Sequence, residues 1–150
     1  MRILNQALTL FPLLVVLPAL ALADPPPALP APDLGAPLTG AEFEAYATGK
    51  TLTYSDGGAV WGQEQYLPGH QVIWAFADAP CQFGSWSEAS GPGGPMLCFT
   101  YDDKPEDVNC WQFYRGPQGL VAQFMEGGAA LSELGQSDQP MQCPGPEVGA

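Results

Sequence analysis

The sequence predicts a mainly β protein: an antiparallel meander or small lipocalin-like barrel of about seven strands, preceded by one short helix and stapled by disulfides. Turn signals recur about every ten to thirteen residues after Gly49, and the runs between them are rich in aromatic and β-branched residues. Connections this short join only neighbouring antiparallel strands. Four cysteines in a chain with an export signal favour two disulfides.

Residues 1–23 have the pattern of a secretory signal peptide. Arg2 supplies a positive charge, residues 7–22 form an apolar run, and an A-x-A motif at residues 21–23 precedes Asp24. The apolar run of about 16 residues is shorter than the ~20 that a membrane-spanning helix needs. Because Asp24 and not a cysteine follows the cleavage site, we expect no lipid anchor and a periplasmic or secreted protein.

Three further segments are predicted after the signal peptide. Residues 24–37 contain six prolines, so we expect an extended linker. Residues 38–143 hold all the cysteines and all the predicted strands, and we expect them to form a single β-rich domain. Residues 144–150 are expected to be a flexible tail.

The chain is strongly acidic. Cleavage after Ala23 removes Arg2 and leaves three cationic residues against sixteen acidic ones, hence a net charge of −13. Phosphate binding needs clustered cations, so we expect neither nucleic acid nor an anionic membrane as a partner. A small cation or a basic protein would instead be steered toward such a surface.

One short helix is predicted over residues 40–48. Thr39 has the position of an N-cap, and Glu42 three residues later completes a capping box. Gly49 can take the left-handed conformation that ends a helix. Phe43 belongs to the apolar face that should pack on the sheet. Because the helix is short, packing rather than intrinsic propensity must hold it.

The predicted strands are separated by turns that contain glycine or proline. We expect them over residues 50–54, 59–66, 71–76, 81–87, 96–101, 109–115 and 120–125. Residues 127–142 have a weak pattern, within which residues 129–134 predict a helical turn.

The cysteines predict the register of one hairpin. If Cys98 lies opposite Cys110, the two can bridge and the neighbouring aromatic side chains share a face. That face gathers Leu97, Phe99, Tyr101, Trp111 and Phe113. Cys81 is then left to pair with Cys143, although the alternative of Cys81–Cys98 with Cys110–Cys143 is also sterically reasonable. No C-x-x-C or H-x-H spacing is present, so neither a metal nor another cofactor is expected.

The candidate binding residues are Trp74, Trp86, Trp111 and Ser90. Tryptophan fills cores, but it also dominates pockets and interfaces. His70 is the single histidine, and no serine lies in a G-x-S-x-G context, so the sequence favours a protein without catalytic activity. Glu64, Glu88 and Asp78 could supply the carboxylate pair of a glycosidase, but the sequence places no two of them across a cleft.

Several short motifs carry a family resemblance. They are L-T-G-A-E-F at residues 38–43, T-L-T-Y at 51–54, Q-Y-L-P-G at 65–69, Cys81, G-S-W at 84–86, L-C-F-T-Y at 97–101 and C-W at 110–111. Together they resemble a group of small exported proteins of Gram-negative bacteria that is classed as a domain of unknown function. The group implies an exported protein and brings no activity with it.

A second resemblance concerns Ala89-Ser90-Gly91. This tripeptide is similar to the inhibitory loop of periplasmic lysozyme inhibitors, which are small exported β-barrels with disulfides. In those proteins a basic residue follows the tripeptide, whereas Pro92-Gly93-Gly94 follows it here. The resemblance implies that Ser90 would contact a basic enzyme, and an acidic protein suits such a partner electrostatically.

Two functions are therefore predicted. The first is a non-enzymatic exported binding module that holds a small ligand in the barrel mouth or a partner protein on its loops. The alternative is an inhibitor of a basic cell-wall hydrolase of lysozyme type. A cavity beneath the tryptophans would support ligand binding, and a filled barrel with a protruding loop near Ser90 would support inhibition.

Overall fold

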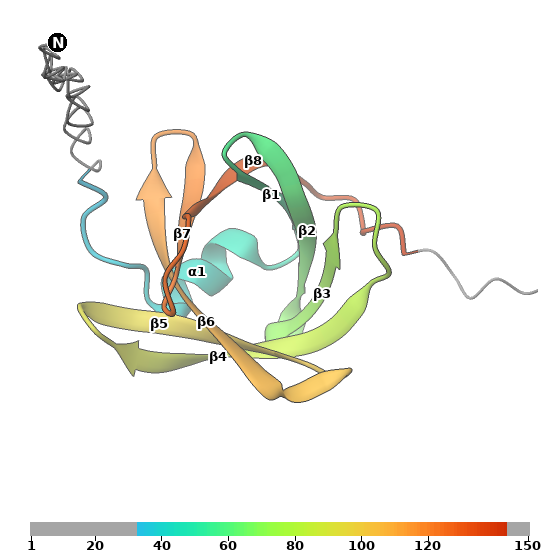
Figure 1. The fold of residues 1–150 in the computed structure, drawn as a ribbon, viewed down its shortest axis with the longest axis horizontal. Helices are drawn as coiled ribbons and strands as arrows, with labels where there is room; N and C mark the ends of the chain where they lie inside the picture. The colour runs from blue at the N-terminus through green and yellow to red at the C-terminus, as the bar shows by residue number, and fades with distance from the viewer. Residues whose placement is uncertain (1–32, 144–150) are drawn as a thin grey trace, which may run out of the picture. The chain divides into compact units, whose positions relative to one another are not determined.

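The computed structural model describes residues 33–143. The predicted signal peptide at residues 1–23, the greater part of the predicted linker and the predicted tail at residues 144–150 lie outside the described residues. Within residues 33–143, eight antiparallel strands form a closed barrel in chain order, and the last strand pairs with the first (Figure 1). The prediction of a small antiparallel barrel is confirmed, with eight strands in place of about seven.

Short connections join the elements. The chain runs through α1 (Gly40–Ala47), β1 (Thr51–Asp56), β2 (Ala59–Leu67), a 3-10 turn (Pro68–His70), β3 (Gln71–Phe76), β4 (Gln82–Gly91), β5 (Gly94–Tyr101), β6 (Lys104–Gly116), β7 (Gly119–Phe124) and β8 (Leu131–Ser137). Because consecutive strands run in opposite directions, the connections between them alternate between the two ends of the barrel. We call the end with the connections at residues 57–58, 77–81, 102–103 and 125–130 the mouth end, and the other the helix end.

The helix begins and ends close to where the sequence predicts. The Thr39 hydroxyl accepts a hydrogen bond from the Glu42 amide at 3.2 Å, and the Glu42 carboxylate accepts one from the Thr39 amide at 2.9 Å. Gly49 follows the helix with φ 84°, a conformation that glycine adopts without strain. The ring of Phe43 is fully buried and lies edge-on to that of Tyr66, with centroids 5.1 Å apart. Helix α1 therefore closes the helix end of the barrel (Figure 1).

The β5–β6 hairpin has the predicted register. Cys98 lies opposite Cys110, Leu97 opposite Trp111, and Phe99 opposite Asn109. The inward face then carries the large side chains, which is the arrangement that specifies a single register.

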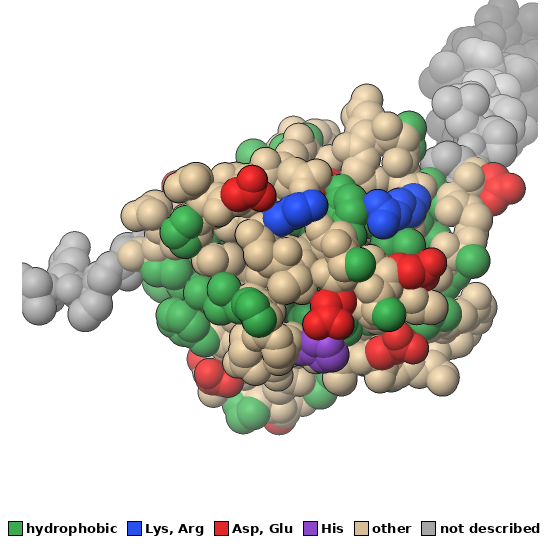
Figure 2. Space-filling model, turned by 180° about the vertical axis from the view of Figure 1, so that it is seen from behind, with side chains coloured by type: hydrophobic (Ala, Val, Ile, Leu, Met, Phe, Trp, Pro, Cys, Tyr) green, Lys and Arg blue, Asp and Glu red, His purple; other side chains and the backbone are tan. Residues whose placement is uncertain are grey.

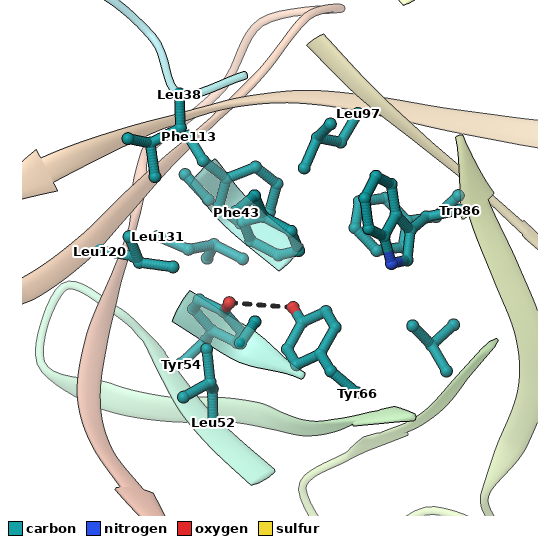
Figure 3. Close-up of a cluster of buried hydrophobic side chains, with 14 of the residues drawn as sticks. Leu38, Phe43, Leu52, Tyr54, Tyr66, Trp86, Leu97, Phe113, Leu120 and Leu131 are labelled. Atoms are coloured by element: carbon teal, nitrogen blue, oxygen red, sulfur yellow. Dashed lines mark hydrogen bonds between the residues drawn. The ribbon is translucent and has the colours of Figure 1, made fainter. Parts of the chain in front are cut away.

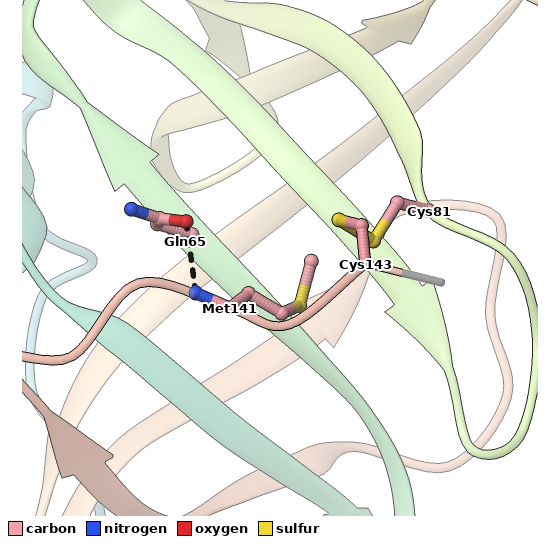
Figure 4. Close-up of a disulfide and its surroundings, with 4 residues drawn as sticks. All are labelled: Gln65, Cys81, Met141 and Cys143. Carbon is pink, nitrogen blue, oxygen red and sulfur yellow. Dashed lines mark hydrogen bonds between the residues drawn. A yellow bond between two sulfur atoms is a disulfide. The ribbon is translucent and has the colours of Figure 1, made fainter. Parts of the chain in front are cut away.

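Two disulfides join Cys98 to Cys110 and Cys81 to Cys143, which is the first of the two connectivities considered. The second bridge fastens the segment after β8 to the start of β4 (Figure 4). Along this segment the Met141 amide donates a hydrogen bond of 3.0 Å to the side-chain oxygen of Gln65 on β2 (Figure 4). The segment is thus held against the outside of the barrel.

The prediction of a helical turn at residues 129–134 is wrong. Residues 131–134 are the first part of β8, which pairs with β1 and β7 and closes the barrel. Leu131 and Glu133 occupy the buried positions of β8, so a charged residue interrupts the apolar alternation from which a strand is predicted. The Glu133 carboxylate is accommodated because the Tyr46 hydroxyl and the Leu120 amide each donate a hydrogen bond of 2.8 Å to it.

The apolar core occupies the helix end of the barrel (Figure 3). Its side chains come from the segment before α1, from α1 and from seven of the strands: Leu38, Phe43, Leu52, Tyr66, Val72, Trp86, Leu97, Phe113 and Leu120. An eight-stranded barrel is wide enough for side chains to fill it or for one small ligand to enter. Here the helix end is filled, and the mouth end is where space remains.

Candidate functional site

A cavity of about 280 Å³ lies inside the barrel at the mouth end. Its wall consists of Tyr54, Trp61, Glu64, Trp74, Phe76, Phe99, Tyr101, Asn109, Trp111, Ala122, Phe124 and Leu131. Trp61 and Phe76 are 42% and 45% exposed, whereas Tyr54, Phe99 and Ala122 are buried. The cavity therefore has an aromatic rim that meets solvent and a floor that does not.

Two glycines make room for aromatic side chains of the wall. A Cβ atom at Gly62 on β2 would lie 2.6 Å from two ring atoms of Trp74 on β3. A Cβ atom at Gly84 on β4 would lie 2.9 Å from the ring of Tyr101 on β5. A Cβ atom at either position would collide with the neighbouring ring. The absence of a side chain at Gly62 and Gly84 therefore allows a large ring to lie across the adjacent strand.

The carboxylate of Glu64 belongs to the cavity wall and is only 4% exposed. The Tyr66 hydroxyl donates a hydrogen bond of 2.7 Å to Oε2, and the Tyr101 hydroxyl donates one of 2.8 Å to Oε1. The hydroxyls of Tyr54 and Tyr66 are 2.9 Å apart (Figure 3). Because the Tyr66 proton is directed at Glu64, Tyr54 is the donor in that pair. Three strands thus supply hydroxyls to one buried carboxylate network.

Burial raises the pKa of Glu64 from 4.5 to about 7. The hydrogen bonds from Tyr66 and Tyr101 favour the ionised form and oppose this shift, but desolvation is the larger effect. Within residues 33–143 the one close contact between a basic and an acidic side chain joins His70 to Glu44 at 3.6 Å, so no described cation neutralises Glu64. The cavity consequently contains a carboxylate that changes charge near neutral pH.

The surface beside the cavity is acidic. A second hollow shares Phe76, Tyr101 and Asn109 with the cavity and so adjoins it. Its charged wall residues are Asp103, Lys104, Glu106, Asp107 and Glu126. The other two cations of the described residues, Lys50 and Arg115, both lie over the ring of Tyr46 on α1, at the helix end. Negative charge therefore prevails around the mouth.

The structure brings two of the four predicted binding residues together. Trp74 and Trp111 both line the cavity. Trp86 does not, because it lies deeper in the barrel, where its ring packs edge-on against Phe43 with centroids 5.5 Å apart. Ser90 is exposed on the β4–β5 hairpin at the helix end, away from the cavity.

The residues considered for catalysis do not meet in the cavity. The His70 ring stacks on Trp86 at 4.0 Å between centroids and lies near Glu44 of α1, on the face that Figure 2 shows with the histidine in purple. Glu88 accepts a hydrogen bond from the Gly40 amide at the start of α1. Of the carboxylates weighed as a glycosidase pair, Glu64 alone lines the cavity.

Sequence reasoning missed the position of Glu64 in the cavity. The available signal was the alternation of β2, in which Gly62, Glu64 and Tyr66 share one face and all three are buried. A charged residue on the inward face of a strand is uncommon, because burying a charge is costly unless it is paired. Trp61 was likewise missed as a rim residue, since its neighbours do not distinguish a rim from an exposed edge.

Comparisons with known proteins do not indicate a function, so we infer it from the cavity and its surroundings. Within the described residues, no helix is long and apolar enough to cross a membrane. No three histidine, cysteine or acidic side chains of residues 33–143 are grouped so that they could hold a metal ion. No family model, curated protein or solved structure matched the chain.

Proposed function

We propose that the protein is an exported, non-enzymatic binding module that holds one small ligand in the mouth of its barrel. The observation that carries this proposal is the open aromatic cavity of about 280 Å³. An engineered cavity of about 150 Å³ binds benzene, and pockets for drug-sized ligands begin at about 300 Å³. The cavity therefore suits a compact ligand with an apolar body of one to three rings.

Export is supported by the disulfides and by the predicted signal peptide. Disulfides persist in oxidising compartments and are rare in the cytosol, and all four cysteines lie in the two bridges. The intact mass of the protein purified from the periplasm should correspond to a chain that begins at Asp24. A chain that retains residues 1–23 would contradict export by this signal.

The alternative function, inhibition of a basic cell-wall hydrolase, uses a different surface. Ser90 is exposed at the helix end, so that a partner enzyme could reach it without entering the cavity. Lysozyme activity measured with a molar excess of the protein, at low and at physiological salt, separates the two functions. Inhibition that Ser90→Trp weakens more than about tenfold would favour this alternative, and no inhibition at either salt would remove it.

A neutral fluorescent probe tests the binding proposal. N-phenyl-1-naphthylamine emits more strongly in apolar surroundings, so its titration into the mature protein should show saturable binding. Ala122 lines the cavity and is buried, so Ala122→Phe should fill the cavity and weaken binding by about tenfold or more. Ala59→Phe makes the same change at an exposed position and should leave the affinity within about twofold. Equal binding by both variants would contradict the proposal.

A further inference from the structure

We propose that the ligand is an organic cation, an alkylated ammonium group on an apolar body, and that the carboxylate of Glu64 is its counter-ion. The inference rests on the proposed ligand-binding function and names the chemical class of the ligand. Three features of the cavity and its surroundings support it independently: the unneutralised carboxylate, the aromatic wall and the acidic mouth.

No basic side chain of residues 33–143 forms an ion pair with the carboxylate of Glu64. Its two oxygens accept hydrogen bonds from Tyr66 and Tyr101, which leaves further lone pairs free. A buried carboxylate without a cation is costly, and a partner of opposite charge offsets that cost. A ligand cation that enters the cavity would supply this charge.

The wall around Glu64 is suited to a cation that carries alkyl groups. Trp61 lies edge-on to Phe76 at 78°, and Trp74 lies edge-on to Phe76 at 89°, so these rings are not stacked on one another. Aromatic faces attract cations, and aromatic cages recognise quaternary ammonium groups. Beyond Glu64 and its tyrosine partners, Asn109 is the one side chain of the wall that has a hydrogen-bond acceptor. An ammonium group with three N–H donors would find few acceptors there, whereas an alkylated one needs few.

The charges around the mouth would attract the same kind of ligand. Asp103, Glu106, Asp107 and Glu126 line the adjoining hollow, against a single lysine, Lys104. A cleft lined by one sign of charge concentrates ligands of the opposite sign and raises their association rate. These exposed carboxylates would guide a cation inward, and Glu64 would hold it.

The charge state of Glu64 would then control affinity. The titratable groups that face it are Tyr66, Tyr101 and, through Tyr66, Tyr54, and burial raises the pKa of all three hydroxyls. These tyrosines stay neutral where Glu64, with a pKa of about 7, changes charge. A cation binds the ionised carboxylate, so its affinity should fall as pH drops from 8 to 6.

A matched pair of probes tests the inference. Benzyltrimethylammonium and neopentylbenzene have the same shape and differ only in the replacement of N⁺ by carbon. Dissociation constants can be measured from the quenching of tryptophan fluorescence in the mature protein at pH 8. The cation should bind at least about tenfold more tightly than the hydrocarbon. Glu64→Gln should abolish that preference, and Glu44→Gln, at the surface contact with His70, should retain it. Benzylamine, which has three N–H donors, should bind less tightly than benzyltrimethylammonium.

The wild-type protein provides a second test that needs no variant. Between pH 8 and pH 6, affinity for benzyltrimethylammonium should fall about tenfold, because the ionised fraction of Glu64 falls by that factor. Affinity for neopentylbenzene should not change. Equal affinities of the two probes, with N-phenyl-1-naphthylamine still bound, would overturn the ligand class and leave the binding function intact. If N-phenyl-1-naphthylamine does not bind either, the binding function itself fails.

Discussion

The Tyr101 hydroxyl on β5 donates a hydrogen bond of 2.8 Å to Oε1 of Glu64 on β2, although 37 residues separate the two in the chain. Both side chains line the cavity, so the bond forms part of its wall. It stabilises the ionised carboxylate and opposes the effect of burial on the pKa of Glu64.

Tyr101→Phe removes this donor and should raise the pKa of Glu64 further above about 7. The loss of one hydrogen bond to a buried charged group should also lower the free energy of unfolding by roughly 1–3 kcal/mol. The pKa can be followed in wild type and variant by NMR titration of the Glu64 side-chain carboxyl carbon. Tyr114→Phe is the matched control, because Tyr114 donates to Gln112 at 2.9 Å, outside the cavity wall. An unchanged pKa in Tyr101→Phe would contradict the role given to this bond.

Glu64 should make the protein less stable as pH rises. Its pKa is about 7 in the folded protein and 4.5 in the reference state, so the folded state holds the proton more tightly. The free energy of unfolding should therefore fall by roughly 3 kcal/mol between about pH 4.5 and pH 7, and then level off.

Glu64→Gln removes this dependence on pH. Urea unfolding at pH 5 and pH 8 should show that the variant gains stability relative to wild type as pH rises. Glu44→Gln, which alters an exposed contact with His70, should differ little from wild type at either pH. If Glu64→Gln changes the free energy of unfolding by the same amount at both pH values, burial does not destabilise the ionised carboxylate of Glu64 as described.

Gly62→Ala should disturb the cavity wall and destabilise the fold. The added Cβ would lie 2.6 Å from the Trp74 ring and 2.5 Å from the backbone oxygen of Ala75, and the latter cannot move aside as a side chain can. Overpacking of this kind costs roughly 1–3 kcal/mol. Gly135→Ala in β8 is the matched control, because nothing lies within 4 Å of a Cβ atom there. Equal unfolding midpoints for the two variants would contradict the close approach of Trp74.

The two disulfides should contribute unequally to stability. The bridges span separations of 12 and 62 residues in the chain, and loop-closure entropy predicts losses of about 3 and about 4 kcal/mol when each is removed. Replacing both cysteines of one bridge by alanine and measuring urea unfolding compares them. Peptide mapping of the oxidised protein should recover Cys98–Cys110 and Cys81–Cys143. A Cys81–Cys98 peptide would show that the connectivity described is not the one formed.

The success of the hairpin prediction has a physical reason. In β5 and β6 the cysteine pair and the aromatic side chains require the same register, so two independent constraints agree at Cys98 and Cys110. The capping box at Thr39 can also be predicted from sequence, because its hydrogen bonds join residues only three positions apart. By contrast, β8 depends on donors from α1 and β7 to accommodate Glu133. Its local sequence therefore carries little strand signal.

The site was harder to predict because depth within a barrel is set by tertiary structure. Trp74 and Trp86 both face inward, and the sequence does not tell which is at the mouth and which is in the core. The distinction arises because the side chains of α1 fill the barrel around Trp86. Glu64 was missed for a related reason, since the tyrosines that surround it come from three strands.

The four tryptophans offer the most direct measurement of whether the cavity binds a ligand. Their indole N–H signals can be followed by ¹H–¹⁵N NMR while N-phenyl-1-naphthylamine is added to the mature protein. Trp61, Trp74 and Trp111 line the cavity, so their signals should shift together and saturate with one affinity. Trp86 packs in the core and should shift little. Shifts at Trp86 alone, or no saturable shift at the three cavity tryptophans, would contradict binding in the barrel mouth.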